Sequence, residues 1–410
     1  MRFSDRIKMS RIEGGIALLD MKLQKPFLFL EKDRYFKLCN NMFNYYSSNI
    51  EDSLLEKLIK NGWVLTEEWP KSTYGYAGKI YHIIIEPTLH CNLNCSHCLR
   101  SAGSNEDEFM SFENYHGKVI PLINSLKPIT VGFMGGEPTT NPDITKIIDG
   151  TLKNTESKIV LYTNGISVDS DLVEILTENA HRTMIQVSVD GCTAETHDSI
   201  RSAGSFKKTM RFLDKLRSKN YRKVLLKMTV IPDNVNEYDK LNEFVKENGW
   251  RLGISVYCRV GRGSTTEVTY EQMNDVLLGI MTDILKADSE FSVDAHMDSS
   301  FFFNRFPCGL GKKGSFTVDP YMNVIDCMNV RRNVGSLNTD DIDEIMHNYY
   351  RLYFPVVEDI PSCSECEFKY ICKGGCRNVV YKHTGSVVGE QSYCKLFRSV
   401  HKKYFSEFIK

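Results

Sequence analysis

The stretch YHIIIEPTLHCNLNCSHC, residues 81–98, joins an apolar run to three closely spaced cysteines. The run 81–87 is rich in β-branched residues, as buried strands are. Five similar runs follow, separated by helical segments such as SDLVEILTENA; the predicted strands span residues 81–87, 129–135, 158–164, 183–190, 223–231 and 251–258. This alternation indicates an α/β fold with a parallel sheet, either doubly wound or a complete or partial barrel, whose chemistry lies at the carboxyl ends of the strands.

The composition is that of an ordinary globular protein. The chain has 410 residues, which favours two or three domains. Its 51 basic and 52 acidic residues give a net charge of −1, so bulk charge indicates no nucleic-acid or membrane partner. The charged N-terminus has no apolar secretion segment, and runs such as HIII (82–85) are too short to span a bilayer. We therefore expect a soluble cytoplasmic enzyme.

Cysteines are unusually frequent and unevenly placed. Thirteen are too many for ordinary core packing, and an odd number fits a disulfide framework poorly. In a reducing cytosol, clustered cysteines indicate metal binding or catalysis. Three lie close together and seven lie in the last quarter of the chain; the positions are 39, 91, 95, 98, 192, 258, 308, 327, 363, 366, 372, 376 and 394.

The first 78 residues have a different pattern. Two short apolar stretches, 15–20 and 26–32, predict a hairpin. The spacing of apolar residues in RYFKLCNNMF (34–43) and IEDSLLEKLIKNGWV (50–64) predicts two helices. Two strands and two helices of this size suggest a small winged-helix-like α+β module. After about residue 300, the sequence is rich in loop residues and cysteine.

Cys91, Cys95 and Cys98 follow the first predicted strand with the spacing C-x3-C-x2-C. Completed by His90 or His97, they would form a four-ligand zinc site. Alone, three thiolates leave one corner of a [4Fe–4S] cluster open to a ligand. The loop resembles the signature of the radical S-adenosylmethionine (SAM) enzymes. That resemblance implies a [4Fe–4S] cluster whose free iron binds SAM and, once reduced, cleaves it to a 5′-deoxyadenosyl radical.

The second predicted strand ends in MGGEPTTNP, which contains Gly135, Gly136 and Glu137. Two glycines let the backbone approach a ligand closely, and a carboxylate accepts hydrogen bonds from an ammonium group. This segment resembles the GGE motif of the radical SAM enzymes. The resemblance implies that it holds the methionine amino group of SAM.

Later strand ends continue the resemblance. The fourth predicted strand ends in SVDG, and ETHDSIRSAGSF (195–206) is similar to a stretch common to the family. Ser188 and Arg201 would then contact the ribose or carboxylate of SAM, although a strand-end hydroxyl and a solvated arginine need no ligand. Val256 and the following CRVGRG suit the place where the adenine packs. The resemblance implies a partial (β/α)6 TIM-like barrel over residues 79–300.

The C-terminal cysteines resemble the SPASM extension of the same enzymes, which carries two auxiliary [4Fe–4S] clusters. Residues 363–376 read CSECEFKYICKGGC, whereas a zinc ribbon would show two CxxC pairs. The resemblance implies three [4Fe–4S] clusters in the protein and a loop-rich iron–sulfur domain over residues 301–410. One auxiliary cluster would take Cys363, Cys366, Cys372 and Cys394, and the other would take Cys308, Cys327 and Cys376.

The chain departs from that pattern at several positions. Phe302 stands where some relatives supply a fourth ligand to the second of these auxiliary clusters. Cys192 and Cys258 are unassigned; either could in principle supply that fourth ligand, but ordinary burial is the favoured interpretation. Met322 replaces the glycine of the pattern DPxGxVxPC. Met328 stands where sulfatase-maturing relatives place a proton-accepting aspartate, which argues against that activity.

SPASM enzymes act mainly on peptides and proteins, and residues 1–78 resemble the leader-recognition modules of maturases of ribosomally made peptides. We therefore expect abstraction of hydrogen from a side-chain or α-carbon of a precursor peptide with a leader, followed by a C–C, C–O or C–S crosslink. A flavodoxin- or ferredoxin-like protein would donate the electrons. The alternatives are maturation of a protein without leader recognition, and a non-catalytic iron–sulfur or zinc scaffold. The sequence does not identify the catalytic base: Tyr257, Asp326 and several exposed acidic residues are all candidates.

Overall fold

The computed structural model describes the greater part of the chain. The described residues are 2–3, 7–12, 15–20, 27–31, 34, 38, 53–60, 64–65, 80–104, 107–265, 277, 280, 314–372, 374–390, 394–399 and 402. They belong to two compact units, which we describe separately. The first unit comprises Met1–Ala77, Leu277–Lys312 and Phe354–Lys410, and the second comprises Gly78–Val276 and Lys313–Tyr353. The three-domain division drawn from the sequence stays a prediction.

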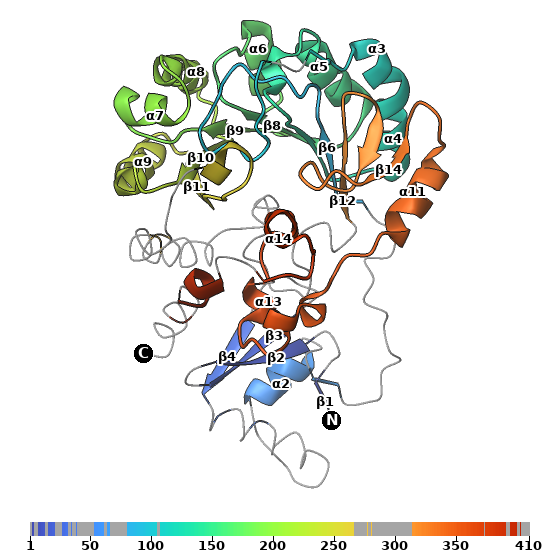
Figure 1. The fold of residues 1–410 in the computed structure, drawn as a ribbon, viewed down its shortest axis with the longest axis vertical. Coiled ribbons are helices and arrows are strands. Elements are labelled where there is room, and N and C mark those ends of the chain that lie inside the picture. The colour runs from blue at the N-terminus through green and yellow to red at the C-terminus, as the bar shows by residue number, and fades with distance from the viewer. Residues whose placement is uncertain are drawn as a thin grey trace. The chain divides into compact units, whose positions relative to one another are not determined.

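Six parallel strands form the centre of the second unit. They are β6 (His82–Ile85), β7 (Thr130–Phe133), β8 (Lys158–Thr163), β9 (Thr183–Ser188), β10 (Val224–Val230) and β11 (Arg251–Val256). They pair in chain order, and every neighbouring pair is parallel. Figure 1 shows the helices on the outer side of this curved sheet. The predicted α/β fold is confirmed, and its arrangement is that of a partial TIM-like barrel.

The connecting helices bury one apolar face against the sheet. Helix α5 buries Ile144, Ile147 and Ile148, whose spacing of three and four residues places them on one face. Helix α6 begins where the Asp169 carboxylate accepts a hydrogen bond from the Asp171 N–H. The helices are α3 (Phe112–Asn114), α4 (Ile120–Leu126), α5 (Ile144–Asn154), α6 (Ser170–Glu178), α7 (Ala194–Ile200), α8 (Ser205–Ser218) and α9 (Tyr238–Glu247), with the π-helix η1 (Tyr115–Val119) and the 3-10 helices η2 (Pro138–Thr140), η3 (Val235–Glu237) and η4 (Gly261–Thr265).

The expectation of loops after residue 300 is wrong for part of this unit. Strand β12 (Ser315–Val318) pairs in parallel with β6, and β13 (Asn323–Ile325) and β14 (Asn333–Ser336) extend the sheet in antiparallel fashion before helix α11 (Ile342–Arg351). Strands this short show little periodicity in a sequence. Met322 lies in the turn between β12 and β13 with φ of +67°. Glycine adopts that conformation without steric cost, which explains the glycine of the family pattern.

The first unit contains a small antiparallel sheet. Strands β3 (Gly15–Asp20) and β4 (Phe27–Glu31) form the predicted hairpin, and β2 (Ile7–Ile12), which the sequence did not indicate, pairs with β3. Helix α2 (Ser53–Lys60) lies within the second predicted helix, whereas most of the first, 34–43, lies outside the described residues. One core joins these elements through Ile7, Leu18, Leu30, Leu38, Leu55, Leu58 and Val64. The unit also contains the strand pair β1 (Arg2–Phe3) and β5 (Val64–Leu65), and the short helices η8 (Val357–Asp359), α12 (Pro361–Ser364), α13 (Lys369–Cys372) and α14 (Arg377–Thr384).

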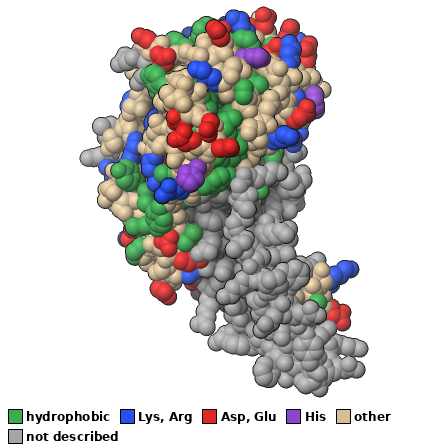
Figure 2. Space-filling model, turned by 90° about the vertical axis from the view of Figure 1, so that its right-hand side faces the viewer, with side chains coloured by type: hydrophobic (Ala, Val, Ile, Leu, Met, Phe, Trp, Pro, Cys, Tyr) green, Lys and Arg blue, Asp and Glu red, His purple; other side chains and the backbone are tan. Residues whose placement is uncertain are grey.

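The distribution of charged side chains on the surface is consistent with the near-neutral net charge. Basic and acidic side chains are interspersed over the described part of the face in Figure 2. Within the described residues, no helix is both long enough and apolar enough to cross a membrane.

Candidate functional site

The cysteine loop, which we define as residues 88–104, follows β6 at the carboxyl end of the sheet. Cys95 is buried, and Cys91 and Cys98 are half-buried. The Ser96 N–H donates to the Ile200 carbonyl over 2.9 Å, and the Cys91 N–H donates to the Gly103 carbonyl over 3.0 Å. Contacts within the loop and with the end of α7 therefore position the three thiols.

The GGE segment after β7 packs directly against the start of this loop. The Gly136 N–H donates to the Thr88 carbonyl over 3.1 Å, and the Glu137 N–H donates to the His90 carbonyl over 2.7 Å. A Cβ on Gly136 would lie 1.9 Å from the His90 oxygen, and one on Gly135 would lie 2.4 Å from the Thr88 oxygen. The predicted close approach is present, and the group approached is the backbone of the cysteine loop.

Glu137 is a buried carboxylate surrounded by neutral donors. It accepts from the Thr139 N–H at 3.1 Å, the Thr139 hydroxyl at 2.7 Å, the Thr163 hydroxyl at 2.7 Å and the Asn164 N–H at 2.7 Å. Burial raises its pKa despite these donors. Among the described residues, no basic side chain forms an ion pair with Glu137. A cationic ligand such as the ammonium group of SAM therefore fits this carboxylate.

The environment of Cys91 suits a cluster ligand. Burial, and then the charges of Glu137 and of the thiolates of Cys95 and Cys98, raise the pKa of Cys91 to about 12. The thiolate form that binds iron is therefore unfavourable unless a positive group compensates its charge. An iron–sulfur cluster held by the three thiols would supply that compensation.

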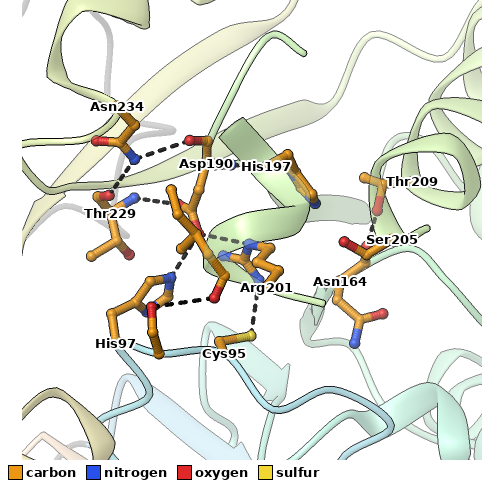
Figure 3. A network of polar contacts seen from close by, with 12 residues as sticks. Cys95, His97, Asn164, Asp190, His197, Arg201, Ser205, Thr209, Thr229 and Asn234 are labelled. Carbon is orange, nitrogen blue, oxygen red and sulfur yellow. Dashed lines mark hydrogen bonds and ion pairs between the residues drawn. The ribbon is translucent and has the colours of Figure 1, made fainter. Parts of the chain in front are cut away.

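Asp190, two residues beyond the end of β9, organises the other side of the loop (Figure 3). Its carboxylate lies 2.7 Å from the Nε2 of His97 and 2.7 Å from the Nε of Arg201, and it accepts from the Thr229 N–H over 2.7 Å. Burial opposes its charge, but Arg201 and His97 hold the pKa of Asp190 well below the usual range. Asp190 was not predicted, although its place in the strand-end SVDG was a signal.

Arg201 and His97 both contact the Asp190 carboxylate. The Arg201 side chain is buried, and its Nη1 lies 3.9 Å from the Sγ of Cys95. The interpretation of Arg201 as a solvated side chain is therefore wrong. The Nε2 of His97 lies 2.7 Å from the Asp190 carboxylate, so this nitrogen already has a partner in the network. Among the described residues, no three His, Cys, Asp or Glu side chains are arranged to hold a single metal ion.

The remaining predicted SAM-site residues lie at strand ends. Ser188 is the last residue of β9 and is half-buried, next to Lys227 of β10 in the sheet register. Val256 is the last residue of β11, paired with Val230 of β10. Both positions are at the carboxyl end of the sheet, and the contacts predicted for them with SAM stay predictions.

Four C-terminal cysteines lie close together in the first unit. Burial, and then the charges of the thiolates at 363, 366 and 394, raise the pKa of Cys372 to about 12. Cys363 is in α12, and Cys372 ends α13. This grouping matches the set predicted for one auxiliary cluster: Cys363, Cys366, Cys372 and Cys394.

The structure does not show whether the cysteines predicted for the other auxiliary cluster lie close together. Cys308 and Phe302 lie outside the described residues. Cys327 follows β13 in the second unit, whereas Cys376 is the exposed residue at the start of α14 in the first. The assignment of these cysteines to one cluster stays a prediction.

Both candidate bases have structural partners. Asp326 is buried and accepts from the Arg332 Nε over 2.6 Å. The buried Tyr257 hydroxyl donates to the Gly263 carbonyl. Cys192 is half-buried, with its Sγ 3.5 Å from the Glu237 carbonyl, in agreement with its structural interpretation.

Known proteins are similar to this chain in sequence or in fold. The profile of the Radical SAM superfamily matches residues 85–245. Mycofactocin maturase MftC of Mycobacterium ulcerans is 27% identical over 305 residues, 71% of this chain and 81% of the relative. The AdoMet-dependent heme synthase of Methanosarcina barkeri is 29% identical over 339 residues, 75% of this chain and 94% of the relative. The structure of Streptococcus suis SuiB bound to precursor peptide SuiA has 15% identity and a TM-score of 0.57, covering 96% of this chain and 99% of that one.

The matched span contains the cysteine loop, the GGE segment, Asp190 and Arg201. The likeness to SuiB, at its low identity, shows a shared fold. The cysteine loop, the GGE segment and Arg201 therefore lie, in this order along the chain, within the span that matches the radical SAM profile. Residues 85–245 therefore form a radical SAM domain, and the chain is an enzyme that uses SAM and a [4Fe–4S] cluster.

Proposed function

We propose that the enzyme is a maturase that modifies a ribosomally made precursor peptide. Once bound and reduced, the cluster supplies the electron that cleaves SAM to a radical able to abstract hydrogen from an unactivated carbon. The observation that carries the radical chemistry is the cysteine loop, packed against the GGE segment beside the buried Glu137. The similarity to mycofactocin maturase MftC directs that chemistry to a peptide.

Each residue of the site has a role in this proposal. Cys91, Cys95 and Cys98 hold the cluster, and Glu137, with Gly135 and Gly136, receives the methionine ammonium. Arg201, fixed by Asp190, binds the SAM carboxylate. Ser188 contacts the ribose, and Val256 packs against the adenine. The support is the position of all these residues at the carboxyl end of one sheet.

The first unit would bind the peptide leader and an auxiliary cluster. The sheet of β2, β3 and β4 offers edge strands, to which an extended leader can add by backbone hydrogen bonds. Cys363, Cys366, Cys372 and Cys394 would hold one auxiliary cluster, and Cys308, Cys327 and Cys376 the other. Forming a crosslink removes two hydrogens from the peptide, so an auxiliary cluster would accept the electron that remains after the first abstraction. An external flavodoxin- or ferredoxin-like donor would reduce the SAM-binding cluster.

A second candidate is SAM-dependent chemistry on a non-peptide substrate such as a porphyrin. The sequence similarity to the AdoMet-dependent heme synthase, which covers 94% of that relative, favours this second candidate. Maturation of a protein without leader recognition is the third. The SAM-cleavage assay described next separates an enzyme from a non-catalytic scaffold. The substrate assay that follows it separates the three candidate substrates from one another.

The experiment uses full-length protein reconstituted anaerobically with iron and sulfide. The reduced enzyme should cleave SAM to 5′-deoxyadenosine, which is measured by liquid chromatography and mass spectrometry. Cys95→Ala should abolish this cleavage, whereas Cys192→Ala, at a half-buried cysteine outside the site, should preserve it. Cleavage retained by Cys95→Ala would contradict the cluster assignment.

The substrate is then tested with peptides encoded beside the gene. A precursor peptide should lose two hydrogens and gain a crosslink detected by tandem mass spectrometry, and removal of its leader should weaken the reaction. Conversion of a porphyrin, with no change in any peptide, would favour the second candidate. Modification of a leaderless protein with equal efficiency would favour the third.

A further inference from the structure

The segment after β11 contacts the cysteine loop directly. The Arg262 N–H donates to the Cys98 carbonyl over 3.1 Å, and the Arg262 Nε donates to the Cys95 carbonyl over 2.8 Å. Arg262 and Cys95 are 167 positions apart in the sequence. One arginine in the segment after β11 therefore bonds to the backbone carbonyls of two cysteines of the loop.

The neighbouring glycines allow this close approach. Gly261 has φ of +62°, and a Cβ there would lie 2.4 Å from the Cys98 oxygen and 2.5 Å from the Leu99 oxygen. A Cβ on Gly263 would lie 2.9 Å from both the Cys258 oxygen and the Tyr257 hydroxyl. Any side chain at position 261 would therefore separate the two loops.

The segment is itself fixed to the end of β11. Tyr257 is buried and its hydroxyl donates to the Gly263 carbonyl, while the buried Val260 donates its N–H to the Cys258 carbonyl over 2.7 Å. The residue next to this anchor, Arg262, is thus held in position before it contacts the cysteine loop. The CRVGRG stretch has a role that its sequence alone did not indicate.

Arg262 also places a positive charge near Cys95. The guanidinium nitrogen Nε bonds to the carbonyl of Cys95, and the Nη1 of Arg201 lies 3.9 Å from the Sγ of the same residue. The reduction potential of an iron–sulfur cluster depends on nearby charge and on hydrogen bonds around its ligands.

We infer that Arg262 is a positioning residue for the SAM-binding cluster. It fixes the cysteine loop through the carbonyls of Cys95 and Cys98, and its charge favours the reduced, more negative state of the cluster. Gly261 makes the contact possible. The inference rests on the cluster bound by the cysteine loop and is independent of which substrate the enzyme modifies.

The test compares two arginines of the same segment in the reconstituted full-length protein. Arg262 contacts the cysteine loop, whereas Arg259 is exposed. Arg262→Gln should lose iron to a chelator about tenfold faster than wild type, because a hydrogen-bonded partner of the ligand backbone is gone. The midpoint potential of the signal that responds to SAM in electron paramagnetic resonance should fall. Arg259→Gln changes the net charge equally and should leave both quantities unchanged.

Two further variants separate charge from position. Arg262→Lys keeps the positive charge but loses the fixed geometry of the guanidinium. Relative to Arg262→Gln, it should therefore bring the midpoint potential closer to the wild-type value than the rate of iron loss. Gly261→Ala should lose iron rapidly, whereas Gly204→Ala should not, because Gly204 also has a positive φ (+75°) but open space around its Cβ position. Wild-type iron retention and potential in Arg262→Gln would overturn the inference. Equal losses in Arg259→Gln and Arg262→Gln would overturn it as well.

Discussion

The two ends of the parallel sheet differ in the kind of polar side chain that they bury. At the carboxyl end, several buried groups are charged, and neutral groups such as Thr163 and Asn164 lie among them; the charged ones are Glu86, Glu137, Asp190, Arg201 and Asp319. At the amino end, the buried groups are mostly neutral. His82 lies 2.5 Å from the Thr130 hydroxyl, and the Thr183 and Tyr221 hydroxyls are 2.9 Å apart. The proposed SAM-binding site lies at the carboxyl end, and no site residue is proposed at the amino end.

The charged end also joins segments that are far apart in the sequence. Arg331, in the turn after Cys327, donates to Glu86 over 2.8 Å and to Asp319 over 3.1 Å, and Arg100 of the cysteine loop also pairs with Glu86. Arg331 and Glu86 are 245 positions apart. A buried ion pair adds little net stability because both charges lose their hydration. We therefore attribute these charges to positioning of the loops that bind the cofactor.

The largest expected effect comes from removing one charge at the carboxyl end. Asp190→Asn leaves the Arg201 guanidinium buried beside a neutral amide. Breaking a buried pair in this way costs about 3 to 5 kcal/mol, so the unfolding temperature should fall. The KM for SAM should rise by about tenfold, which corresponds to a loss of about 1.4 kcal/mol. Thermal unfolding and SAM-cleavage kinetics measure the two effects.

Asp214→Asn is the matched control for this prediction. It removes the same charge from a pair with Arg217 whose side chains are 56% and 57% exposed. Exposed pairs contribute about 0 to 1 kcal/mol, so this variant should behave as wild type. If Asp190→Asn kept the wild-type KM for SAM, Asp190 would be a structural residue only.

A smaller effect, which depends on pH, is expected at the amino end. Burial lowers the pKa of His82 to about 4, whereas an unfolded histidine titrates near about 6.5. Above the unfolded value His82 is neutral in both states, so its titration does not change the stability there. As the pH falls, the unfolded chain binds a proton that the folded chain does not, so stability falls by about 2 kcal/mol at about pH 5.

His82→Asn should remove this share of the acid sensitivity. Urea unfolding at about pH 7.5 and about pH 5 should show a smaller loss of stability in the variant than in wild type. His197, whose pKa burial also lowers to about 4, adds a loss of the same sign in both proteins. SAM cleavage near neutral pH should not change, since His82 lies at the opposite end of β6 from the cysteine loop. An unchanged acid sensitivity would contradict the role of His82.

The sequence predicted what depends on local pattern. The six parallel strands follow from apolar runs, and the cysteine loop and Glu137 follow from motifs whose residues are adjacent in the sequence. Asp190 and Arg262 were missed because their partners are distant: 93 positions separate Asp190 from His97, and 167 separate Arg262 from Cys95. Strands β12 to β14 were missed because they have only three or four residues. Their structure depends on the pairing of β12 with β6, of β13 with β12 and of β14 with β13.

The smallest effect should come from a single neutral hydrogen bond at the amino end. Tyr221→Phe removes the hydroxyl that lies 2.9 Å from Thr183, while Thr183 keeps the Leu176 carbonyl at 2.6 Å as an acceptor. The expected cost is about 1 kcal/mol in the free energy of unfolding, with no change in SAM cleavage. Tyr321→Phe, at an exposed tyrosine, should change neither quantity. A loss of SAM cleavage in Tyr221→Phe comparable to that in Asp190→Asn would show that both ends of the sheet support the cofactor site.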